Sequence, residues 1–279
     1  TTVSAAAAGM AGGFASKILD GTMFVEGNLV FAGVGEPLGA FLAVITCVYV
    51  GRLVSGKTRV DILVTPFVCI VSGSAVGLLL GPGISRFMTW LGSVINWGTE
   101  QAPFLMGIVV SVLMGIILTL PISSAALGII LGLNGIAAGA ATVGCCANMI
   151  GFAVASFREN KINGLLAQGL GTSMLQIGNI VKKPVIWLPA IITSAILGPV
   201  STCVLGMTNN ATGSGMGTAG LVGQINAYQT MVSQGISHGI VLLEIILMHI
   251  VIPAILALGI SEFMRKKGWI KTGDMKLDI

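Results

Sequence analysis

An apolar stretch of about 55 residues, from Ala102 to Phe157, constrains this chain more than any other feature. A helix needs about 20 apolar residues to cross the hydrocarbon core of a bilayer, so this stretch alone is long enough for three crossings. Of the 279 residues, 54% are hydrophobic and 9% are charged, whereas an ordinary soluble domain carries about 25% charged residues. A soluble fold is therefore excluded. The sequence predicts an all-α, polytopic membrane protein of about seven to nine transmembrane helices, with one or two re-entrant segments and a broken helix.

Short basic clusters separate the apolar runs and indicate how the spans are oriented. They lie after the run Leu38–Val54, at Arg158 and Lys161, at Lys182 and Lys183, and after the long run Ile236–Phe263. Cytoplasmic loops of membrane proteins are enriched in Lys and Arg, so we interpret the net charge of +4 as a sign of topology and not of a nucleic-acid partner. We expect one membrane-embedded domain over residues 1–279, with 265–279 as a cytoplasmic basic tail.

The region after the span Val60–Gly81 contains a short amphipathic segment. Trp90 and Trp97 lie within it, seven residues apart. That spacing is close to two helical turns, so both rings fall on one face, as in helices that lie in the membrane interface. We therefore expect residues 82–101 to form a loop that carries an interfacial helix.

A broken helix is predicted near Asn134. The apolar segment Ile122–Leu133 has only about a dozen residues, which is too short to cross at about 1.5 Å per residue. We expect it to continue past Asn134 and Gly135. Non-helical backbone at membrane depth is tolerated only where it is buried in protein or lines a water-filled cavity, so Asn134 is a candidate substrate ligand.

The segment Asn163–Val181 is predicted to enter the membrane and return to the same side. It lies between basic residues at Lys161 and Lys182, and a single crossing would place one of these clusters outside. Its glycines and amides, Gln176 and Asn179 among them, suit a re-entrant hairpin. An amphipathic helix on the membrane surface is the alternative.

The segment Gly206–Gly223 is rich in glycine and carries no charge. It is either an outer loop or a second re-entrant element whose backbone lines the transport pathway. Side-chain amides offer both a donor and an acceptor, which suits an uncharged, hydroxyl-rich ligand. The amides that we predict as substrate ligands are Asn134, Gln176, Asn179, Asn209 and Asn210.

Four ionisable side chains in or beside the apolar runs are further candidate ligands, because a charge inside the membrane is costly unless it is paired or hydrated. They are Glu36, His238, Glu244 and His249. Each also has a structural interpretation, as a buried imidazole or as an interfacial or buried acid. His238 and His249 share a helix face but would lie about 16 Å apart along the axis, so they do not form a metal site with Glu244 alone.

Catalysis and bound cofactors are not expected in this chain. The five cysteines lie in apolar runs, without the spacing of a zinc site or a disulfide framework. The glycine-rich loop typical of ATP binding is absent from the sequence. We therefore predict no metal, no cofactor and no catalytic residue.

Two blocks of the sequence resemble the membrane-embedded IIC component of the sugar phosphotransferase system, in particular its fructose- and mannitol-type permeases and their regulator-like relatives. Pro121–Phe152 resembles the family's Pro-x-x-x-Ala-Ala block and the small-residue helix after it, and Gly171–Val200 resembles its re-entrant segment and the start of the next span. The resemblance implies a homodimer in a bacterial-type inner membrane, with a scaffold part and a mobile part that gives alternating access. It also implies a sugar or polyol substrate, and phosphorylation, where it occurs, by a separate cytoplasmic IIB partner.

One departure from the family pattern bears on function. Fructose-type members carry Thr-Glu-Gly in the re-entrant segment, and the Glu is expected to contact sugar, whereas this chain has Gln176, Ile177 and Gly178 there. The leading hypothesis is a sugar permease with a pocket near the bilayer midplane. The missing carboxylate favours a second hypothesis, a membrane sensor or regulator with little transport. A third is an ion-coupled transporter or channel for another small solute, with 206–223 as its filter or gate.

Overall fold

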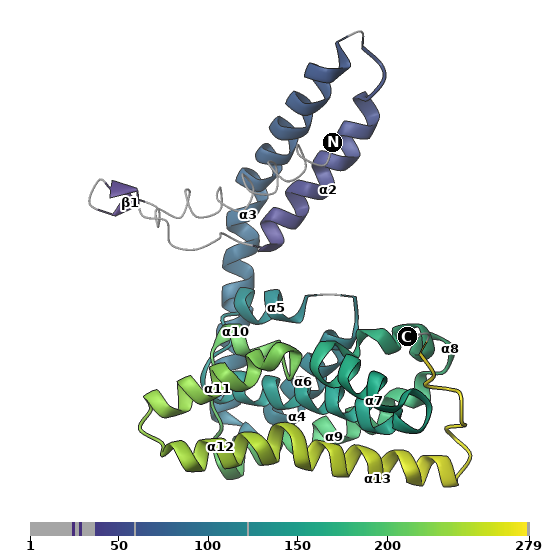
Figure 1. Cartoon of the computed structure of the whole chain (residues 1–279). Helices are drawn as coiled ribbons and strands as arrows, with labels where there is room; N and C mark the ends of the chain where they lie inside the picture. The colour runs from purple at the N-terminus through teal and green to yellow at the C-terminus, as the bar shows by residue number, and fades with distance from the viewer. Residues whose placement is uncertain (1–23, 26–27, 30–36, 59, 122, 278–279) are drawn as a thin grey trace. The chain divides into compact units, whose positions relative to one another are not determined.

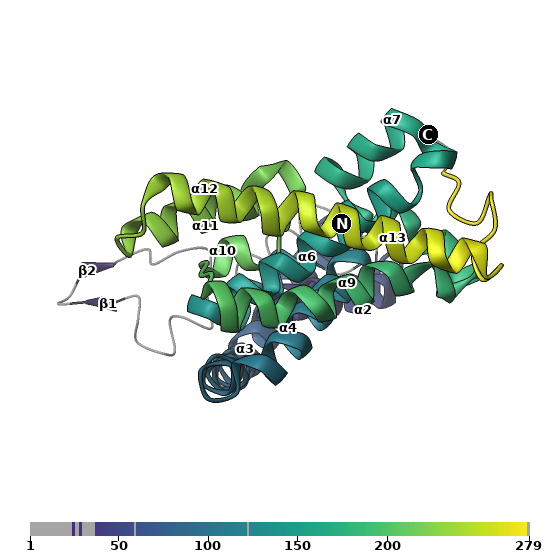
Figure 2. The same ribbon diagram turned by 90° about the horizontal axis from the view of Figure 1, so that it is seen from below.

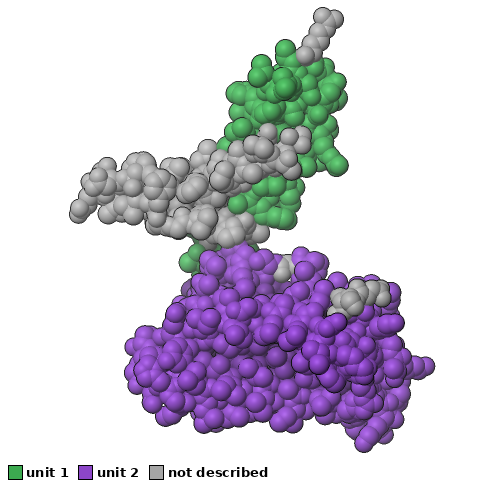
Figure 3. All heavy atoms as spheres, viewed as in Figure 1, with its two compact units in different colours: residues 1–91 green, residues 92–279 purple. Residues whose placement is uncertain are grey.

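The computed structural model of the protein describes residues 24–25, 28–29, 37–58, 60–121 and 123–277. The chain divides into two compact units, residues 1–91 and 92–279, drawn in green and purple in Figure 3. One predicted ligand, Glu36, lies outside the described residues. The other candidate ligands all belong to the second unit.

The first unit contains a small β-hairpin and apolar helices. Strands β1 (Phe24–Val25) and β2 (Asn28–Leu29) pair antiparallel, α2 spans Pro37–Val54, and α3 begins in this unit and spans Asp61–Gln101. Helices α2 and α3 pack together at two buried cysteines, since Cys69 Sγ lies 3.4 Å from the carbonyl oxygen of Cys47.

Helix α3 is continuous over 41 residues, so the loop predicted over residues 82–101 is wrong. Trp90 and Trp97 both lie on this helix, and both are exposed. Pro82 removes only one backbone donor, and prolines inside helices are tolerated in membrane proteins because neighbouring groups satisfy the freed carbonyl. The tryptophan spacing therefore predicted the helix but not its continuity with the preceding span.

The second unit contains a helix that is interrupted between α5 and α6, and α6 lies at its centre. Helix α4 spans Pro103–Thr119, α5 spans Ser124–Ile130 and α6 spans Gly135–Ala155. The predicted broken helix is confirmed, because the helical backbone stops after Ile130 and resumes only at Gly135. Gly132 and Gly135 have φ angles of +58° and +56°, which glycine adopts without the steric cost of a Cβ. Helix α6 is almost entirely buried and lies among the other helices of the unit (Figure 1).

After α6 the chain forms a helical hairpin, which we call the amide hairpin (Phe157–Lys182). Its elements are α7 (Phe157–Leu166), the π-helical turn η1 (Ala167–Gly171), the 3₁₀ turn η2 (Ser173–Gln176) and α8 (Ile177–Lys182). Thr172 between the two turns is extended, with φ −160°. The arms lie against each other, since Gln176 Nε2 donates a hydrogen bond of 2.9 Å to Gln168 Oε1.

The next span leads into a second interrupted segment, which we call the glycine-rich hairpin (Gly206–Gly223). The span consists of η3 (Pro184–Trp187), α9 (Leu188–Pro199) and η4 (Val200–Leu205), and the hairpin contains α10 (Ala211–Ser214) and η5 (Ala219–Leu221). The later elements are α11 (Val222–Ser233), α12 (His238–Ile246), the π-turn η6 (Leu247–Val251) and α13 (Ile252–Lys266). Elements α12, η6 and α13 form one long helix along a side of this unit (Figures 1 and 2).

Small residues allow α4, α6 and α9 to pack at short distances. A Cβ added to Gly144 of α6 would overlap the carbonyl oxygen of Ser111 in α4. A Cβ on Gly198 of α9 would likewise overlap the carbonyl oxygen of Gly107 in α4. In lipid, helices associate through such close contacts because apolar burial no longer drives association.

Three helices among the described residues are long and apolar enough to cross a membrane, namely Gly135–Ala155, Pro184–Leu205 and His238–Lys266. Shorter apolar helices are Ala40–Val54, Asp61–Gly77 and Pro103–Thr119. Together with the helical content of both units, they confirm the prediction of an all-α, polytopic membrane protein.

Candidate functional site

The glycine-rich hairpin runs along α6 and comes back. At its start, Asn209 N donates to the Gly135 carbonyl oxygen (3.1 Å), and Asn209 Nδ2 donates to Thr142 Oγ1 (2.7 Å) and to the carbonyl oxygen of Gly223 (3.1 Å) at its end. Between these ends, Thr218 Oγ1 lies 3.4 Å from Met149 Sδ. Met149 is about 21 Å along α6 from Gly135 at about 1.5 Å per residue. The hairpin therefore penetrates most of the length of α6 and returns.

The amide hairpin approaches the same point from the other end of α6. It is anchored at the Ala155 end, where Gln168 Nε2 donates to Ser156 Oγ (2.9 Å). The hairpins touch where Thr218 Oγ1 donates to the carbonyl oxygen of Gly169, in η1. The interruptions of both hairpins therefore meet beside Met149, well inside the unit.

A buried cluster of uncharged polar groups is centred on Asn148, the residue before Met149 in α6. Asn148 Nδ2 donates to Ser194 Oγ (3.1 Å), and Trp187 Nε1 donates to Asn148 Oδ1 (3.0 Å). Thr119 Oγ1 lies 3.4 Å from Asn148 Oδ1 and 2.8 Å from Ser173 Oγ of the amide hairpin. Buried groups that both donate and accept can exchange hydrogen bonds with the hydroxyls of a ligand.

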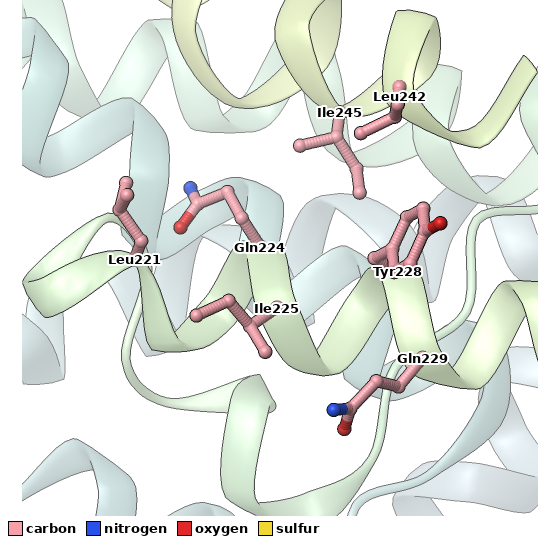
Figure 4. Close-up of a pocket in the computed structure, with 7 residues that line it drawn as sticks. All are labelled: Leu221, Gln224, Ile225, Tyr228, Gln229, Leu242 and Ile245. Carbon is pink, nitrogen blue, oxygen red and sulfur yellow. The ribbon is translucent and has the colours of Figure 1, made fainter. Parts of the chain in front are cut away.

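A cavity of about 370 Å³ opens beside the end of the glycine-rich hairpin, between α11 and α12. Figure 4 shows Gln224 and Tyr228 on α11, with Leu242 and Ile245 of α12 across from them. Gln224 is buried, and its Oε1 accepts no hydrogen bond from the part of the chain that the structure describes. The cavity thus combines apolar walls, an aromatic ring and one unused acceptor, a composition typical of small-molecule sites.

A second cavity, of about 310 Å³, lies where the two hairpins meet. Its walls include Gly169 and Thr218 from the hairpins, Ile150 from α6 and Ile250 from η6. Both cavities are lined by Leu221, which has a φ of +60°. A positive φ is unusual for a residue with a branched side chain, and such strain concentrates at functional sites. The backbone at Leu221 therefore separates two adjoining spaces in a conformation that its surroundings must enforce.

Two of the predicted ligands, Gln176 and Asn179, bind the C-terminal tail. Gln176 Nε2 donates to the carbonyl oxygen of Met275 (3.0 Å), and Asn179 Nδ2 donates to that of Lys276 (2.9 Å) and to Gln176 Oε1 (2.9 Å). Asn160 binds the same stretch. Its Nδ2 donates to Met275 O and its Oδ1 accepts from Leu277 N, each at 2.8 Å. The polar groups of the amide hairpin therefore bind backbone groups at and just after a turn in the chain's own tail.

An ion pair completes this attachment. Lys183 Nζ lies 2.6 Å from Asp274 Oδ2, and the backbone N–H of Lys271 donates to the same oxygen. Burial opposes ionisation of Asp274, but the hydrogen bonds from Lys183 and Lys271 outweigh it and hold the pKa of the carboxyl below its usual range. The tail is thus fastened by a carboxylate that stays charged at neutral pH.

Three other predicted ligands lie together at the opposite end of α6. Asn134 precedes Gly135, which pairs with Asn209, and the neighbouring Asn210 donates through Nδ2 to Asn226 Oδ1 (2.9 Å). Asn210 Oδ1 also caps α10 by accepting from Gly213 N. Because α6 is 21 residues long, this group lies about 30 Å from the amides that bind the tail. The structure therefore divides the five predicted amides into two groups.

The ionisable candidates on the last long helix do not gather at one point. His238 Nδ1 lies 2.8 Å from the hydroxyl of Tyr228, which lines the α11–α12 cavity. Glu244 is partly buried, and its Oε2 has no partner among the described residues. His249 is buried in η6, and its Nδ1 likewise lacks a partner among them. π-helical turns such as η6 occur frequently at functional sites.

A comparison with protein families identifies the chain. The family model described as "Phosphotransferase system, EIIC" matches residues 1–277. The chain belongs to this EIIC family. The resemblance drawn from two sequence blocks is confirmed at the family level, and the protein is a membrane permease component of a sugar phosphotransferase system. No curated protein and no solved structure shows a significant match to it.

Sequence reasoning missed most of the hydroxyl groups around the meeting point of this EIIC protein. Thr119 and Thr218 are single hydroxyl residues, and Ser173 follows Thr172, all in apolar or glycine-rich surroundings. Such residues commonly bond to their own backbone, so nothing in their spacing distinguishes them. Asn148 and Gln224 carried a signal, since an amide inside an apolar run needs partners, but the sequence did not show which partners they have.

Proposed function

We propose that this EIIC protein is a permease for a sugar or related polyol that works by alternating access, with its substrate site where the two hairpins meet. The contact between Thr218 and Gly169 carries the proposal. Through it, two interrupted segments that approach α6 from opposite ends touch inside the unit. Interrupted helices that end within the membrane are typical of transporter substrate sites, because irregular backbone is tolerated there only when it is buried or lines a cavity.

The basic residues give the orientation in this proposal. Arg158 and Lys161 lie near the start of the amide hairpin, and Lys182 and Lys183 lie at its end, so both ends face the cytoplasm by the positive-inside rule. The amide hairpin then re-enters from the inside and the glycine-rich hairpin from the outside. The tail bound to the amide hairpin is cytoplasmic in this orientation.

The Asn148 cluster, Thr218 and Gln224 are the substrate ligands that we favour. Their amides and hydroxyls match a hydroxyl-rich ligand, and the substrate's hydroxyls would replace the bonds that the cluster now makes internally. The two groups of predicted amides then border the entrances to the site: Asn134, Asn209 and Asn210 outside, and Gln176 and Asn179 inside. Four further candidates remain proposals without an assigned place in the path: Glu36, His238, Glu244 and His249.

Movement of the amide hairpin relative to α6 would open the site to the cytoplasm. Among the described residues, hydrogen bonds join Ser173 of the hairpin to Thr119 and Gly169 of the hairpin to Thr218, so these bonds would break and re-form during the movement. In this proposal the protein is a homodimer in a bacterial-type inner membrane, and a separate IIB partner phosphorylates the sugar at the cytoplasmic side.

A sensor or regulator with little transport is the second candidate function. One observation favours it: the amides of Gln176 and Asn179, on either side of the position where the family carboxylate is missing, are occupied by the tail. A sensor would bind sugar and change the exposure of the tail without carrying flux.

Uptake of radiolabelled hexoses and hexitols into proteoliposomes tests the proposal, with and without a phosphorylating cytoplasmic fraction. We expect saturable uptake that Thr218→Val lowers at least about tenfold, the equivalent of one lost hydrogen bond. Thr193→Val is the matched control, because Thr193 is buried in α9 and its hydroxyl, within the part of the chain that the structure describes, donates only to Pro189 O of its own helix (2.7 Å). Sugar binding without flux would identify the sensor, and flux that requires a sodium or proton gradient would identify an ion-coupled transporter. If the protein neither takes up nor binds any sugar or polyol, the permease proposal is refuted.

A further inference from the structure

A cavity of about 500 Å³ lies at the end of α13, formed by residues that have no part in the proposed sugar path. Its walls come from the start of the amide hairpin, from α13 and from the tail. Four cationic side chains and one acid line it: Arg158, Arg265, Lys266, Lys271 and Glu262. Such a concentration of positive charge around a concave space favours an anionic ligand.

Arg265 is paired on one side only, so part of its guanidinium lacks a partner among the described residues. Its side chain is only 7% exposed. Its Nη2 donates to Glu159 Oε1 (3.1 Å) and to the carbonyl oxygen of Ala155 (3.0 Å). Its Nε and Nη1 are buried and donate to no group among the described residues. Guanidinium carries five N–H donors, so three of them remain unused in a buried arginine, and leaving buried charged donors unsatisfied costs free energy.

The acids nearby do not neutralise the cavity. Glu262 pairs with Arg158 (2.7 Å) in its wall, and Glu159 pairs with Arg265 behind it (3.1 Å). Four cations against two carboxylates leave a net charge of about +2. Lys266 and Lys271 supply that excess, and the Thr272 hydroxyl adds a neutral donor to the lining.

We propose that this cavity binds a phosphate group. A phosphate monoester carries a charge of about −1.5 to −2 at neutral pH and three strong acceptor oxygens, which matches the excess charge. A rotation of the Arg265 side chain towards the cavity that it lines would let its unused donors bind these oxygens. Arginine is well suited to phosphate because its planar donors fit the oxygens. The volume exceeds what inorganic phosphate needs, so the cavity accommodates a phosphate with an organic group attached.

Two sources supply that chemistry at a membrane surface: a soluble phosphate compound and the head group of an anionic phospholipid. Binding of inorganic phosphate and of glycerol 3-phosphate to the detergent-solubilised full chain, measured by calorimetry, tests the first. Retention of phosphatidylglycerol against phosphatidylcholine, measured by native mass spectrometry, tests the second.

Four variants make the test specific. Lys271→Gln and Arg158→Gln each remove one charge from the wall, and Arg265→Lys keeps the charge but removes the unused guanidinium donors. Glu262→Gln removes the acid in the wall. Lys182→Gln is the matched control, since Lys182 is exposed at the end of the amide hairpin and does not line the cavity. Monodisperse elution and an unchanged melting temperature establish that a variant is folded.

We expect at least one probe to bind with an affinity that Lys271→Gln, Arg158→Gln and Arg265→Lys each weaken about tenfold, that Glu262→Gln strengthens, and that Lys182→Gln leaves unchanged. Dependence of glycerol 3-phosphate binding on these residues identifies a soluble ligand, and dependence of phosphatidylglycerol retention identifies a lipid. Absence of binding by every probe overturns the proposal. Equal weakening by Lys182→Gln and Lys271→Gln also overturns it, because the binding is then general surface electrostatics.

Discussion

Gln176 and Met275 lie 99 residues apart in the sequence and are joined by a hydrogen bond of 3.0 Å from Gln176 Nε2 to the Met275 carbonyl oxygen. The other hydrogen of this amide goes to Gln168 Oε1, and Gln176 Oε1 accepts from Asn179. The donors of Gln176 are thus fully used within the chain. A ligand that bound here would first have to displace the tail. The position of the tail is therefore coupled to that of the amide hairpin.

Replacing Asn160 tests this coupling. Asn160→Ala removes two hydrogen bonds to the tail, one from Nδ2 to Met275 O and one to Oδ1 from Leu277 N. At about 1 kcal/mol each, we expect the free energy of unfolding to fall by about 2 kcal/mol and the tail to become sensitive to protease. Thermal unfolding and limited proteolysis measure both. The exposed Asn163→Ala on the same helix is the control and should change neither. Equal protease resistance of the two variants would contradict the attachment.

Gln176→Glu places a carboxylate next to the position of the missing family Glu, which corresponds to Ile177. A glutamate has no N–H donor, so the bonds to Gln168 Oε1 and Met275 O are lost and a carboxylate faces two oxygens in a buried position. We expect the protein to lose at least about 2 kcal/mol of stability, because buried polar groups without partners are costly. Gln229→Glu, at an exposed position, should be nearly neutral. A Gln176→Glu variant as stable as the wild type would show that the tail bonds contribute little.

The ion pair between Lys183 and Asp274 gives the tail a pH dependence. The pKa of Asp274 is lower in the folded protein than its ordinary value, so the unfolded chain binds more protons in the acidic range. The stabilisation is therefore present above the ordinary pKa of about 3.9 and is lost as the pH falls through the lower, folded value. Asp274→Asn should lower the melting temperature at pH 7, and the difference from the wild type should shrink towards pH 3. A difference that stays constant over this range would rule out the carboxylate as its cause.

The close contact of α4 with α6 depends on glycine. In Gly144→Ala, the added Cβ would overlap the carbonyl oxygen of Ser111 in α4. Because this neighbour is backbone, the overlap is relieved only if α4 and α6 move apart. We expect a loss of about 1 to 3 kcal/mol, the usual cost of overpacking. Gly259→Ala is the control, because its Cβ meets no atom within 4 Å and alanine favours the helix by up to about 1 kcal/mol. Denaturation in detergent measures both, and a neutral Gly144→Ala would contradict the packing.

Much of the fold followed from local sequence. Apolar length predicted the membrane class, and the short run before Asn134 predicted the broken helix, because a helix of that length cannot span a bilayer. The continuity of α3 through Pro82 was not predictable in the same way, since a proline breaks some helices and only perturbs others. The site depended on contacts between distant residues. The bond of Gln176 to the tail and that of Thr218 to Gly169 join segments whose sequences give no sign of each other, and the candidate ligands were consequently placed in one pocket that the structure divides.

The sidedness of the amide hairpin tests the account most directly. Lys161→Cys and Lys182→Cys, each in a Cys203→Ser background that removes the exposed native thiol, can be labelled in intact cells and in inverted membrane vesicles with a membrane-impermeant maleimide. The account predicts that both positions react only in inverted vesicles, since the hairpin enters and leaves the membrane on the cytoplasmic side. Reaction of one position from outside and the other from inside would make the segment a single crossing, and the meeting of two re-entrant hairpins beside Met149 would be contradicted.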